Sequence, residues 1–291
     1  MVKIKVLEEF ILHQKSFDKS DATIKSYRSD ITKFATWFKE TNSDAMSFRK
    51  ITPTDLRQYK RFLISSDRKP STINRHLISI KVFLEWGWQV KQIKYRFPMP
   101  KPVRQNKIAP QWLGKTEQNS LLRYIECHAG NRDIAIIKIL LNTGARVNEL
   151  CQLKWTSVLL SERKGNMTVN YGKGNKCRDI PLNKDARNAF LLLGYKEHTE
   201  KDGYVFTGQR GPLTPRGIQL IFRRLFNQSN FATLTPHKLR HTFCKNLINA
   251  DVSLEKVAAL AGHENLNTTK TYCKPSLSDL SEAVELIGEE E

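Results

Sequence analysis

A proline-rich segment about a third of the way along the chain limits what this sequence can fold into. Residues 94–110 carry four prolines with cations between them. Because proline fixes φ and lacks a backbone N–H, a helix cannot continue through this segment, which predicts an extended, fairly stiff connector. The 291 residues are enough for two domains with separate cores. We therefore expect an N-terminal domain at 1–93, an interdomain linker at 94–110 and a C-terminal domain at 111–291.

The N-terminal part predicts four helices and no strand. Apolar residues recur at helical spacing over 2–14. Cap signals at Ser20 and Thr52 begin a second and a third helix, and a fourth begins at Ser71 and runs to Trp88. Together these elements predict a small all-α domain.

The C-terminal part predicts a mainly α domain with a small β-sheet. Two segments of alternating character, 167–171 and 177–182, flank a Gly-Lys-Gly-Asn turn and are typical of a hairpin. A short amphipathic helix is expected at 278–287. The other expected helices begin at a Thr116 cap and lie at 134–142, 184–195, 216–227, 237–249 and 254–261.

The composition favours a polyanionic partner. The formal net charge is +19 and the isoelectric point is about 9.8, and both halves of the chain are basic. Five scattered cysteines without a C-x-x-C pair fit reduced thiols in a cytosolic protein better than a disulfide framework. No apolar N-terminal region or membrane-length apolar run is present. We therefore expect a cytoplasmic protein.

The segment 235–272 carries side chains suited to chemistry on an anion. A Thr-Pro pair begins a helix, which places His237 and Arg240 on one face of its first turn. A cation beside the exposed N–H groups of a helix start favours a phosphate. His263 follows a glycine, and Tyr272 comes nine residues later. An isolated His-x-x-Arg pair is more often the polar edge of an amphipathic helix, so its meaning depends on the rest of the chain.

Two upstream segments indicate which function the His237 and Arg240 pair serves. Thr-Gly-Ala-Arg-Val-Asn-Glu-Leu at 143–150 follows an apolar helix, and Lys173 lies between two glycines. With these segments the chain resembles the tyrosine recombinases, also called the phage integrase family, over residues 1–288. Members carry, in order, an Arg in Thr-Gly-x-Arg-x-x-Glu-Leu, a hairpin Lys, His-x-x-Arg, a second His after Gly, and a Tyr nucleophile nine residues on. The six matching positions here are Arg146, Lys173, His237, Arg240, His263 and Tyr272.

The resemblance implies an enzyme, a site-specific DNA recombinase that needs no metal or cofactor. Tyr272 would attack a phosphodiester and conserve its energy as a 3′-phosphotyrosine, with His237 assisting proton transfer. Lys173 would protonate the 5′-oxygen leaving group, although Lys176 in the same turn could substitute. Strands would then be exchanged through a Holliday junction.

Two arginines would stabilise the phosphate during this reaction. The guanidinium groups of Arg146 and Arg240 can each donate two hydrogen bonds to non-bridging oxygens. Cations fixed in this way stabilise the charge that develops in the transition state. By resemblance, His263 would donate a hydrogen bond to the scissile phosphate, and Glu149 would orient the nearby groups.

The resemblance also implies how the protein meets DNA. A SAM-like core-binding domain and the catalytic domain would form a C-shaped clamp on double-stranded DNA with inverted half-sites. A homotetramer would form through the helix at 278–287, and the bacterial protein would work on the nucleoid. Arg75 and Lys81 are the best candidates for groove contacts. The other candidate DNA contacts are Lys25, Arg28, Lys60, Arg61 and Arg104.

Other functions compete with this interpretation. A type IB topoisomerase uses a similar set but typically has Lys at the position of His237. A catalytically silent DNA-binding relative would not fill all six positions. Within the family, no arm-binding domain precedes the first helix, which favours Xer-type enzymes or transposon cointegrate resolvases, with integration or excision of a mobile element as the alternative. A metal site is conceivable from one histidine and cysteine set, namely His237, His241, Cys244 and His263.

Overall fold

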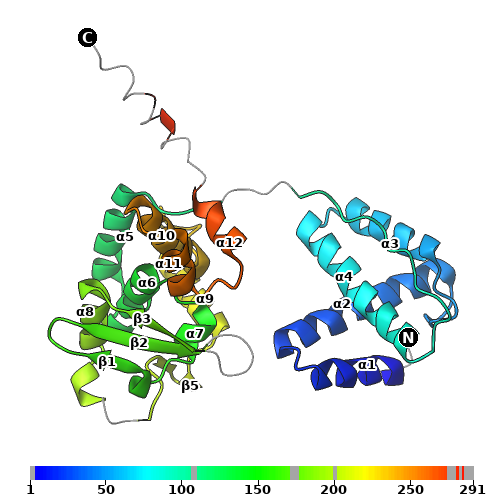
Figure 1. The fold of residues 1–291 in the computed structure, drawn as a ribbon, viewed down its shortest axis with the longest axis horizontal. Coiled ribbons are helices and arrows are strands. Elements are labelled where there is room, and N and C mark those ends of the chain that lie inside the picture. Colours follow the sequence, from blue (N-terminus) through cyan, green and yellow to red (C-terminus); the bar gives the residue numbers. More distant parts are fainter. Residues whose placement is uncertain are drawn as a thin grey trace. The chain divides into compact units, whose positions relative to one another are not determined.

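The computed structural model divides the chain into two units, Met1–Lys107 and Ile108–Glu291. It describes residues 4–105, 110–170, 177–198 and 202–273, together with 280, 281 and 284. Helices dominate both units, and the second also contains small β-sheets (Figure 1). The predicted fold class, mainly α with a small β-sheet in the C-terminal part, is therefore confirmed.

The first unit is a four-helix domain whose helix starts follow the local sequence. Its helices are α1 (Ile4–Ser16), α2 (Asp21–Asn42), α3 (Pro53–Ser65) and α4 (Pro70–Gln89). The Ser20 side chain accepts a hydrogen bond from the Thr23 backbone N–H at the start of α2. A reciprocal capping box between Thr52 and Asp55 begins α3. The fully buried side chains at the centre include Phe10, Ile31, Phe34 and Phe83.

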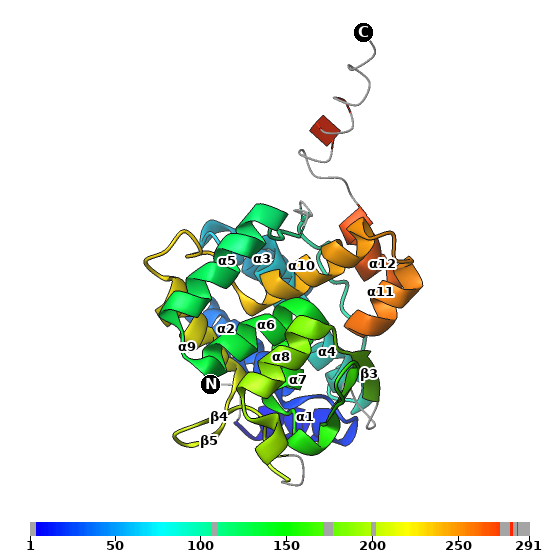
Figure 2. The ribbon, with the colours of Figure 1, turned by 90° about the vertical axis from the view of Figure 1, so that its left-hand side faces the viewer.

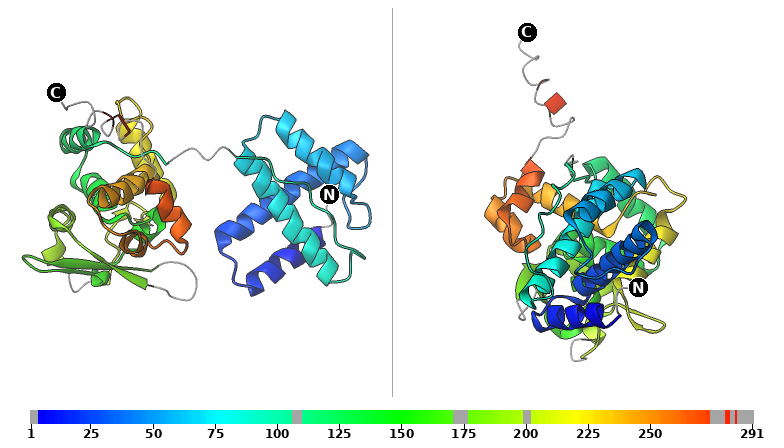
Figure 3. Two further views of the ribbon diagram at one scale, coloured as in Figure 1. Left: turned by 45° about the horizontal axis from the view of Figure 1, so that its top comes forward. Right: turned by 90° about the vertical axis from the view of Figure 1, so that its right-hand side faces the viewer.

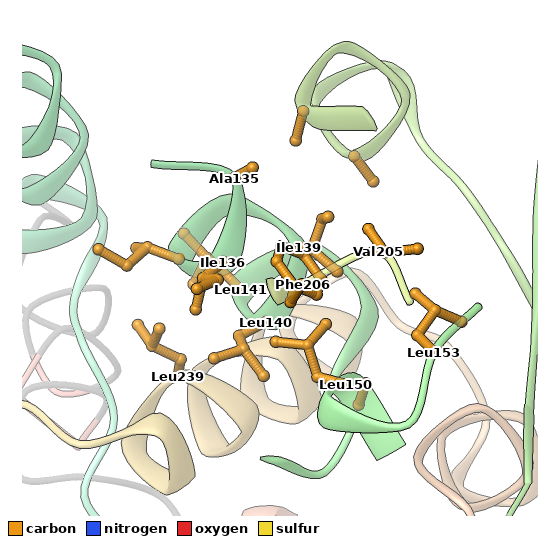
Figure 4. Close-up of a cluster of buried hydrophobic side chains, with 14 of the residues drawn as sticks. Ala135, Ile136, Ile139, Leu140, Leu141, Leu150, Leu153, Val205, Phe206 and Leu239 are labelled. Carbon is orange, nitrogen blue, oxygen red and sulfur yellow. The ribbon is translucent and has the colours of Figure 1, made fainter. Parts of the chain in front are cut away.

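The second unit places its helices around a buried α6. The helices are α5 (Lys115–His128), α6 (Asn131–Thr143), α7 (Val147–Cys151), α8 (Lys184–Leu192), α9 (Pro215–Phe226), α10 (Pro236–Asn249), α11 (Leu254–Ala261) and α12 (Leu266–Lys270). Short 3-10 helices span Trp155–Ser157, Tyr195–Glu197 and Thr271–Cys273. Helix α6 packs against α8 and α10 (Figure 2). Its side chains meet those of neighbouring segments in the core shown in Figure 4, which includes Ile136, Ile139, Leu140, Phe206 and Leu239.

An antiparallel sheet lies along one side of the second unit (Figure 3). Its strands, in spatial order, are β1 (Val158–Leu160), β2 (Gly165–Asn170) and β3 (Cys177–Pro181). The predicted pair of strands is present as β2 and β3, and the sequence did not predict β1. The turn at 171–176 lies outside the described residues. A second, two-stranded sheet joins β4 (Thr207–Gly208) and β5 (Gly211–Pro212).

The start of α5 differs from the predicted one. The predicted Thr116 cap is wrong, because the cap of α5 is Gly114, whose N–H donates to the Glu117 carboxylate at 2.7 Å. Thr116 instead lies in the first turn.

The helix predicted at 278–287 falls mostly outside the described residues. Among the helices that the structure describes, none has the length and apolar character to cross a membrane.

Candidate active site

Tyr272 lies buried in a small cluster formed by the last helices. The 3-10 helix that follows α12 carries it, and only 1% of its surface is exposed. Its ring packs with Cys244 from α10 and Val257 from α11. Burial raises the pKa of the phenol above its ordinary value, and the Cys244 side chain, hydrogen-bonded to it, acts in the same direction. The hydroxyl therefore keeps its proton near neutral pH in this position.

Two histidine rings from α10 lie next to Tyr272. His241 Nδ1 is 2.6 Å from the phenolic oxygen, and the His237 ring lies edge-on to the His241 ring at 4.1 Å between centroids. Besides Cys244, the histidine that is hydrogen-bonded to Tyr272 is thus His241, one turn after the expected His237. The sequence pattern could not separate them, because residues i and i+4 share a helical face.

Two helix ends hold the paired arginines. Arg240 is 3% exposed and donates hydrogen bonds to the Gly144 and Ala261 carbonyls, the second at 2.6 Å. Arg146 Nη2 donates to the Gly262 carbonyl at 2.6 Å. Carbonyls at helix C-termini carry partial negative charge, which favours guanidinium groups there. Burial lowers the pKa of Arg240 to about 10, with Arg146 contributing, so Arg240 remains charged at neutral pH.

Glycine is required at both helix ends. Gly144 and Gly262 have φ of +61° and +66°, in the left-handed region. A Cβ on Gly144 would lie 2.3 Å from the Phe243 ring, and one on Gly262 would lie 2.5 Å from Arg178 Nη1. The Thr-Gly-x-Arg and Gly-His motifs thus place backbone carbonyls where the arginines need them.

The buried Glu149 carboxylate organises the cations. It accepts hydrogen bonds from the Arg146 backbone N–H and from Nη1 of that side chain, at 2.7 and 2.9 Å. It also accepts two from Arg178, each at 2.8 Å. Burial acts to raise the pKa of Glu149, but the hydrogen bonds from both arginines outweigh it and lower the pKa. Glu149 is therefore a carboxylate that fixes two guanidinium groups.

Arg178 is a member of this group that sequence reasoning missed. Its side chain is 8% exposed, whereas that of Arg146 is 41% exposed. Arg178 Nε also donates to the Leu260 carbonyl at 2.9 Å. It lies on β3, in a segment predicted as a strand, but nothing in the local pattern links it to a glutamate on α7. Arg146 has the exposure needed to meet a ligand, and Arg178 supports Glu149 from within.

His263 completes the group from the turn between α11 and α12. Its backbone N–H donates to the Ala258 carbonyl at 2.9 Å, and its ring lies parallel to Tyr272 within 9° at 6.2 Å between centroids. Burial lowers the pKa of His263 to about 4, helped by Arg240 and Arg146. Burial likewise lowers the pKa of His241 to about 4, with His237 and Arg240 contributing. These two rings are therefore neutral at pH 7.

The predicted lysine and the alternative metal site complete the list of expected site groups. Lys173 and its alternative Lys176 lie outside the described residues. Within the part of the chain that the structure describes, no three His, Cys, Asp or Glu side chains are grouped to hold a metal ion, so the alternative metal site has no support there. The assembled groups are two paired guanidinium cations, neutral imidazoles and a phenol, which suit acid–base and nucleophilic chemistry on a phosphodiester.

A pocket of about 350 Å³ opens beside His237. Its wall includes Gln219, Arg223 and Asn227, which follow one another at four-residue spacing on and just after α9. The start of α10 also lines the pocket, through Thr235 and Pro236.

Several predicted DNA-contact residues in the first unit form ion pairs with acidic side chains. Arg75 Nη1 donates to both oxygens of Asp30 at 2.7 Å, yet the Arg75 side chain is 45% exposed. Lys81 pairs loosely with Glu85 at 3.7 Å. Arg28 is paired with Glu8, and Lys60 donates to the Lys101 carbonyl at 2.7 Å. The remaining candidates are exposed, and they are Lys25, Arg61 and Arg104.

Both units match described protein families. Residues 111–278 match the Phage integrase family, and residues 7–89 match the "Phage integrase, N-terminal SAM-like domain". The chain is 30% identical over 269 residues to a protein named tyrosine recombinase XerC from Staphylococcus carnosus (strain TM300), covering 90% of this chain and 89% of that protein. It is 30% identical over 285 residues to tyrosine recombinase XerC from Bacillus pumilus (strain SAFR-032), covering 94% and 91%.

Solved structures share the fold at lower identity. The Tn1549 transposon integrase in complex with transposon right end DNA matches with a TM-score of 0.74 at 21% identity, covering 97% of this chain and 98% of that one. XerH bound to palindromic difH substrate, a post-cleavage complex, matches with a TM-score of 0.72 at 23% identity, covering 95% and 83%.

Proposed function

The chain belongs to the phage integrase family of tyrosine recombinases, and we propose that Tyr272 is the nucleophile with which it cleaves and rejoins DNA in site-specific recombination. The observation that supports this role is that Arg146 and Arg240 bond to the carbonyls of Gly262 and Ala261, directly before His263, whose ring lies parallel to that of Tyr272. A tyrosine attacks a phosphodiester only where cations stabilise both the phenolate and the pentavalent phosphorus. The two arginines provide these cations, and the neutral His263 ring adds a hydrogen-bonding group beside them.

The two arginines bind the scissile phosphate in this mechanism. Arg146 reaches the surface while Glu149 and the Gly262 carbonyl fix its guanidinium. Arg240 is more deeply placed and keeps its charge near neutral pH. Both cations are positioned before substrate arrives, so little reorganisation accompanies the development of charge in the transition state. Lys173 is proposed to protonate the 5′-oxygen leaving group.

The position of Tyr272 in the structure is a resting one. A side chain with 1% exposure cannot reach a DNA phosphate, so the 3-10 helix that carries Tyr272 after α12 must move outward. His241 and Cys244 hold the phenol at rest. We assign to His237, which borders the pocket beside α9, the proton transfer at the displaced phenol. Attack then yields a 3′-phosphotyrosine and a free 5′-hydroxyl, and a second duplex reverses the step through a Holliday junction.

The substrate is double-stranded DNA with inverted half-sites, bound by a homotetramer. One relative of this fold is described as bound to palindromic difH substrate, and another as in complex with transposon right end DNA. The SAM-like unit grips one side of the duplex through Arg75, whose guanidinium Asp30 presents at the surface. The helix at 278–287 is proposed to join neighbouring subunits, and the protein to act in the bacterial cytoplasm on the nucleoid.

Resolution of a replicon or mobile element is the role we favour. The relatives named XerC cover about nine tenths of this chain, and topoisomerase-like relaxation is not favoured by any of them. Integration or excision of a mobile element is the second candidate, because the Tn1549 transposon integrase shares the fold over 97% of this chain.

The experiment is covalent trapping on a nicked duplex. A duplex recovered from a random library by repeated binding is nicked near the cleavage point, so that the released fragment diffuses away and the covalent complex persists. The wild type, in excess EDTA, should give a denaturation-resistant complex, and Tyr272→Phe should bind the duplex without forming one. The matched control is Tyr195→Phe, which also removes a buried, hydrogen-bonded hydroxyl, and it should retain trapping. A covalent complex with Tyr272→Phe would refute the assignment.

A further inference from the structure

The hydroxyl of Thr269 contacts a ring nitrogen of His263 from inside the fold. Thr269 Oγ1 lies 2.9 Å from His263 Nδ1. Thr269 is on α12 and is fully buried, with 0% of its surface exposed. The backbone of His263 is fixed separately, by the left-handed Gly262 cap and by the bond to the Ala258 carbonyl. The ring is thus held from the side that faces away from solvent.

The direction of this hydrogen bond follows from the buried hydroxyl. Among the described residues, the Thr269 side chain makes no hydrogen bond other than the one to His263. Buried hydroxyl protons in native proteins are almost always paired. A neutral imidazole has one donor and one acceptor nitrogen, and the hydrogen bond made by one nitrogen decides which of them keeps the proton. If the hydroxyl donates, Nδ1 accepts and the proton of the ring lies on Nε2.

We propose that Thr269 is a positioning residue that holds His263 in the Nε2–H form, so that the ring presents a donor to the phosphate. This inference rests on the proposed function and on the role that the family resemblance implies for His263, a hydrogen bond to the scissile phosphate. The opposite tautomer would turn a lone pair toward anionic oxygens and leave the buried Thr269 proton without an acceptor. Because the low pKa of His263 keeps the ring neutral at pH 7, protonation of both nitrogens does not remove the choice.

The neighbouring threonine provides a matched control. Thr268 precedes Thr269 in the same short helix, but its side chain is exposed. Thr269→Val keeps the shape of the side chain and removes the hydroxyl, Thr269→Ser restores the hydroxyl, and Thr268→Val makes the same chemical change outside the contact.

The first measurement needs no DNA. Long-range 1H–15N spectra of the full chain with 15N-labelled histidine, assigned with His263→Gln, report the tautomer at pH 7. We expect the Nε2–H pattern for His263 in the wild type, in Thr269→Ser and in Thr268→Val, and a mixture in Thr269→Val. A wild-type ring protonated on Nδ1, or on both nitrogens, would overturn the proposal even if Thr269→Val failed to fold.

The second measurement links the tautomer to the reaction. Covalent trapping on the nicked duplex should slow about 10-fold or more in Thr269→Val with DNA affinity unchanged, and Thr269→Ser should recover most of the rate. Full activity in a folded Thr269→Val would overturn the positioning role. If the wild type shows the Nε2–H ring but traps no DNA, the proposed function fails while the tautomer assignment stands.

Discussion

Each unit of this protein holds an arginine at its surface with a buried carboxylate, but the two carboxylates serve different numbers of cations. Asp30, 0% exposed, binds Arg75 and also contacts His76 Nε2 and accepts a hydrogen bond from the Ser79 hydroxyl. Glu149, 5% exposed, binds both Arg146 and Arg178. The two surface arginines are similarly exposed, at 45% and 41%.

The difference lies in the charge that remains for a ligand. The charges of Asp30 and Arg75 cancel, so this pair presents one fixed donor group with little excess charge. Around Glu149, the additional cations Arg178 and Arg240 leave a positive excess in a partly buried site. Positioning a phosphate requires only the first arrangement, whereas stabilising the charge of a transition state requires the second.

The largest effect expected from this comparison is on cleavage rate. Arg240→Ala should slow covalent trapping by about 10²–10³-fold, because it removes a fixed donor to the developing charge. Arg75→Ala should leave the rate at saturating DNA within about threefold, because Arg75 only positions the duplex. Single-turnover trapping on the nicked duplex measures both. Equal rate losses in the two variants would break the comparison.

The next effect concerns stability. Glu149→Gln should lower the free energy of unfolding by about 3 kcal/mol or more, because Arg178 is left buried without its counter-charge. Asp30→Asn should cost about 1–2 kcal/mol, since the half-exposed Arg75 can turn toward water. Urea unfolding of the full chain, followed by fluorescence, gives both values. A larger loss for Asp30→Asn than for Glu149→Gln would show that the carboxylate of the first unit contributes more to stability.

A smaller effect is expected in the salt dependence of binding. Arg75→Ala should reduce the slope of log affinity against log salt by about 1, the value for one phosphate contact. Band-shift titrations between low and moderate salt measure the slope. An unchanged slope would remove Arg75 from the set of phosphate contacts and leave the exposed Lys25, Arg61 and Arg104 among the candidates.

A further effect is a pH dependence of stability. The unfolded chain takes up protons at ordinary histidine pKa values near 6.5, whereas His241 and His263 in the folded protein do so only near 4. Between these values the unfolded state binds more protons, so stability should fall as pH decreases from about 6.5 to 4. His241→Gln should flatten this trend in thermal melts. A melting temperature that rose on acidification would contradict the sign.

The sequence predicted the helix caps and strands that depend on short-range patterns. The caps at Ser20 and Thr52 and the strands β2 and β3 follow from short spacings, whereas the candidate site positions from Arg146 to Tyr272 came from the resemblance of an ordered set of motifs to a family. The three-residue strand β1 is too short for its alternation to be recognised.

The contacts that organise the site were beyond sequence reasoning. The pairs Arg178–Glu149, His241–Tyr272 and Thr269–His263 depend on how β3, α7, α10 and α12 pack. The histidine pair illustrates the limit, because one helical face carries both rings and only the packing of α12 selects which one meets the phenol.

The most direct test of the central claim is to find the atom that carries the DNA. The trapped covalent complex is digested with nuclease and trypsin, and the nucleotide-bearing peptide is sequenced by mass spectrometry. We predict a 3′-phosphonucleotide on the peptide that follows Lys270, at its single tyrosine, Tyr272. A nucleotide attached to any other side chain would contradict the account.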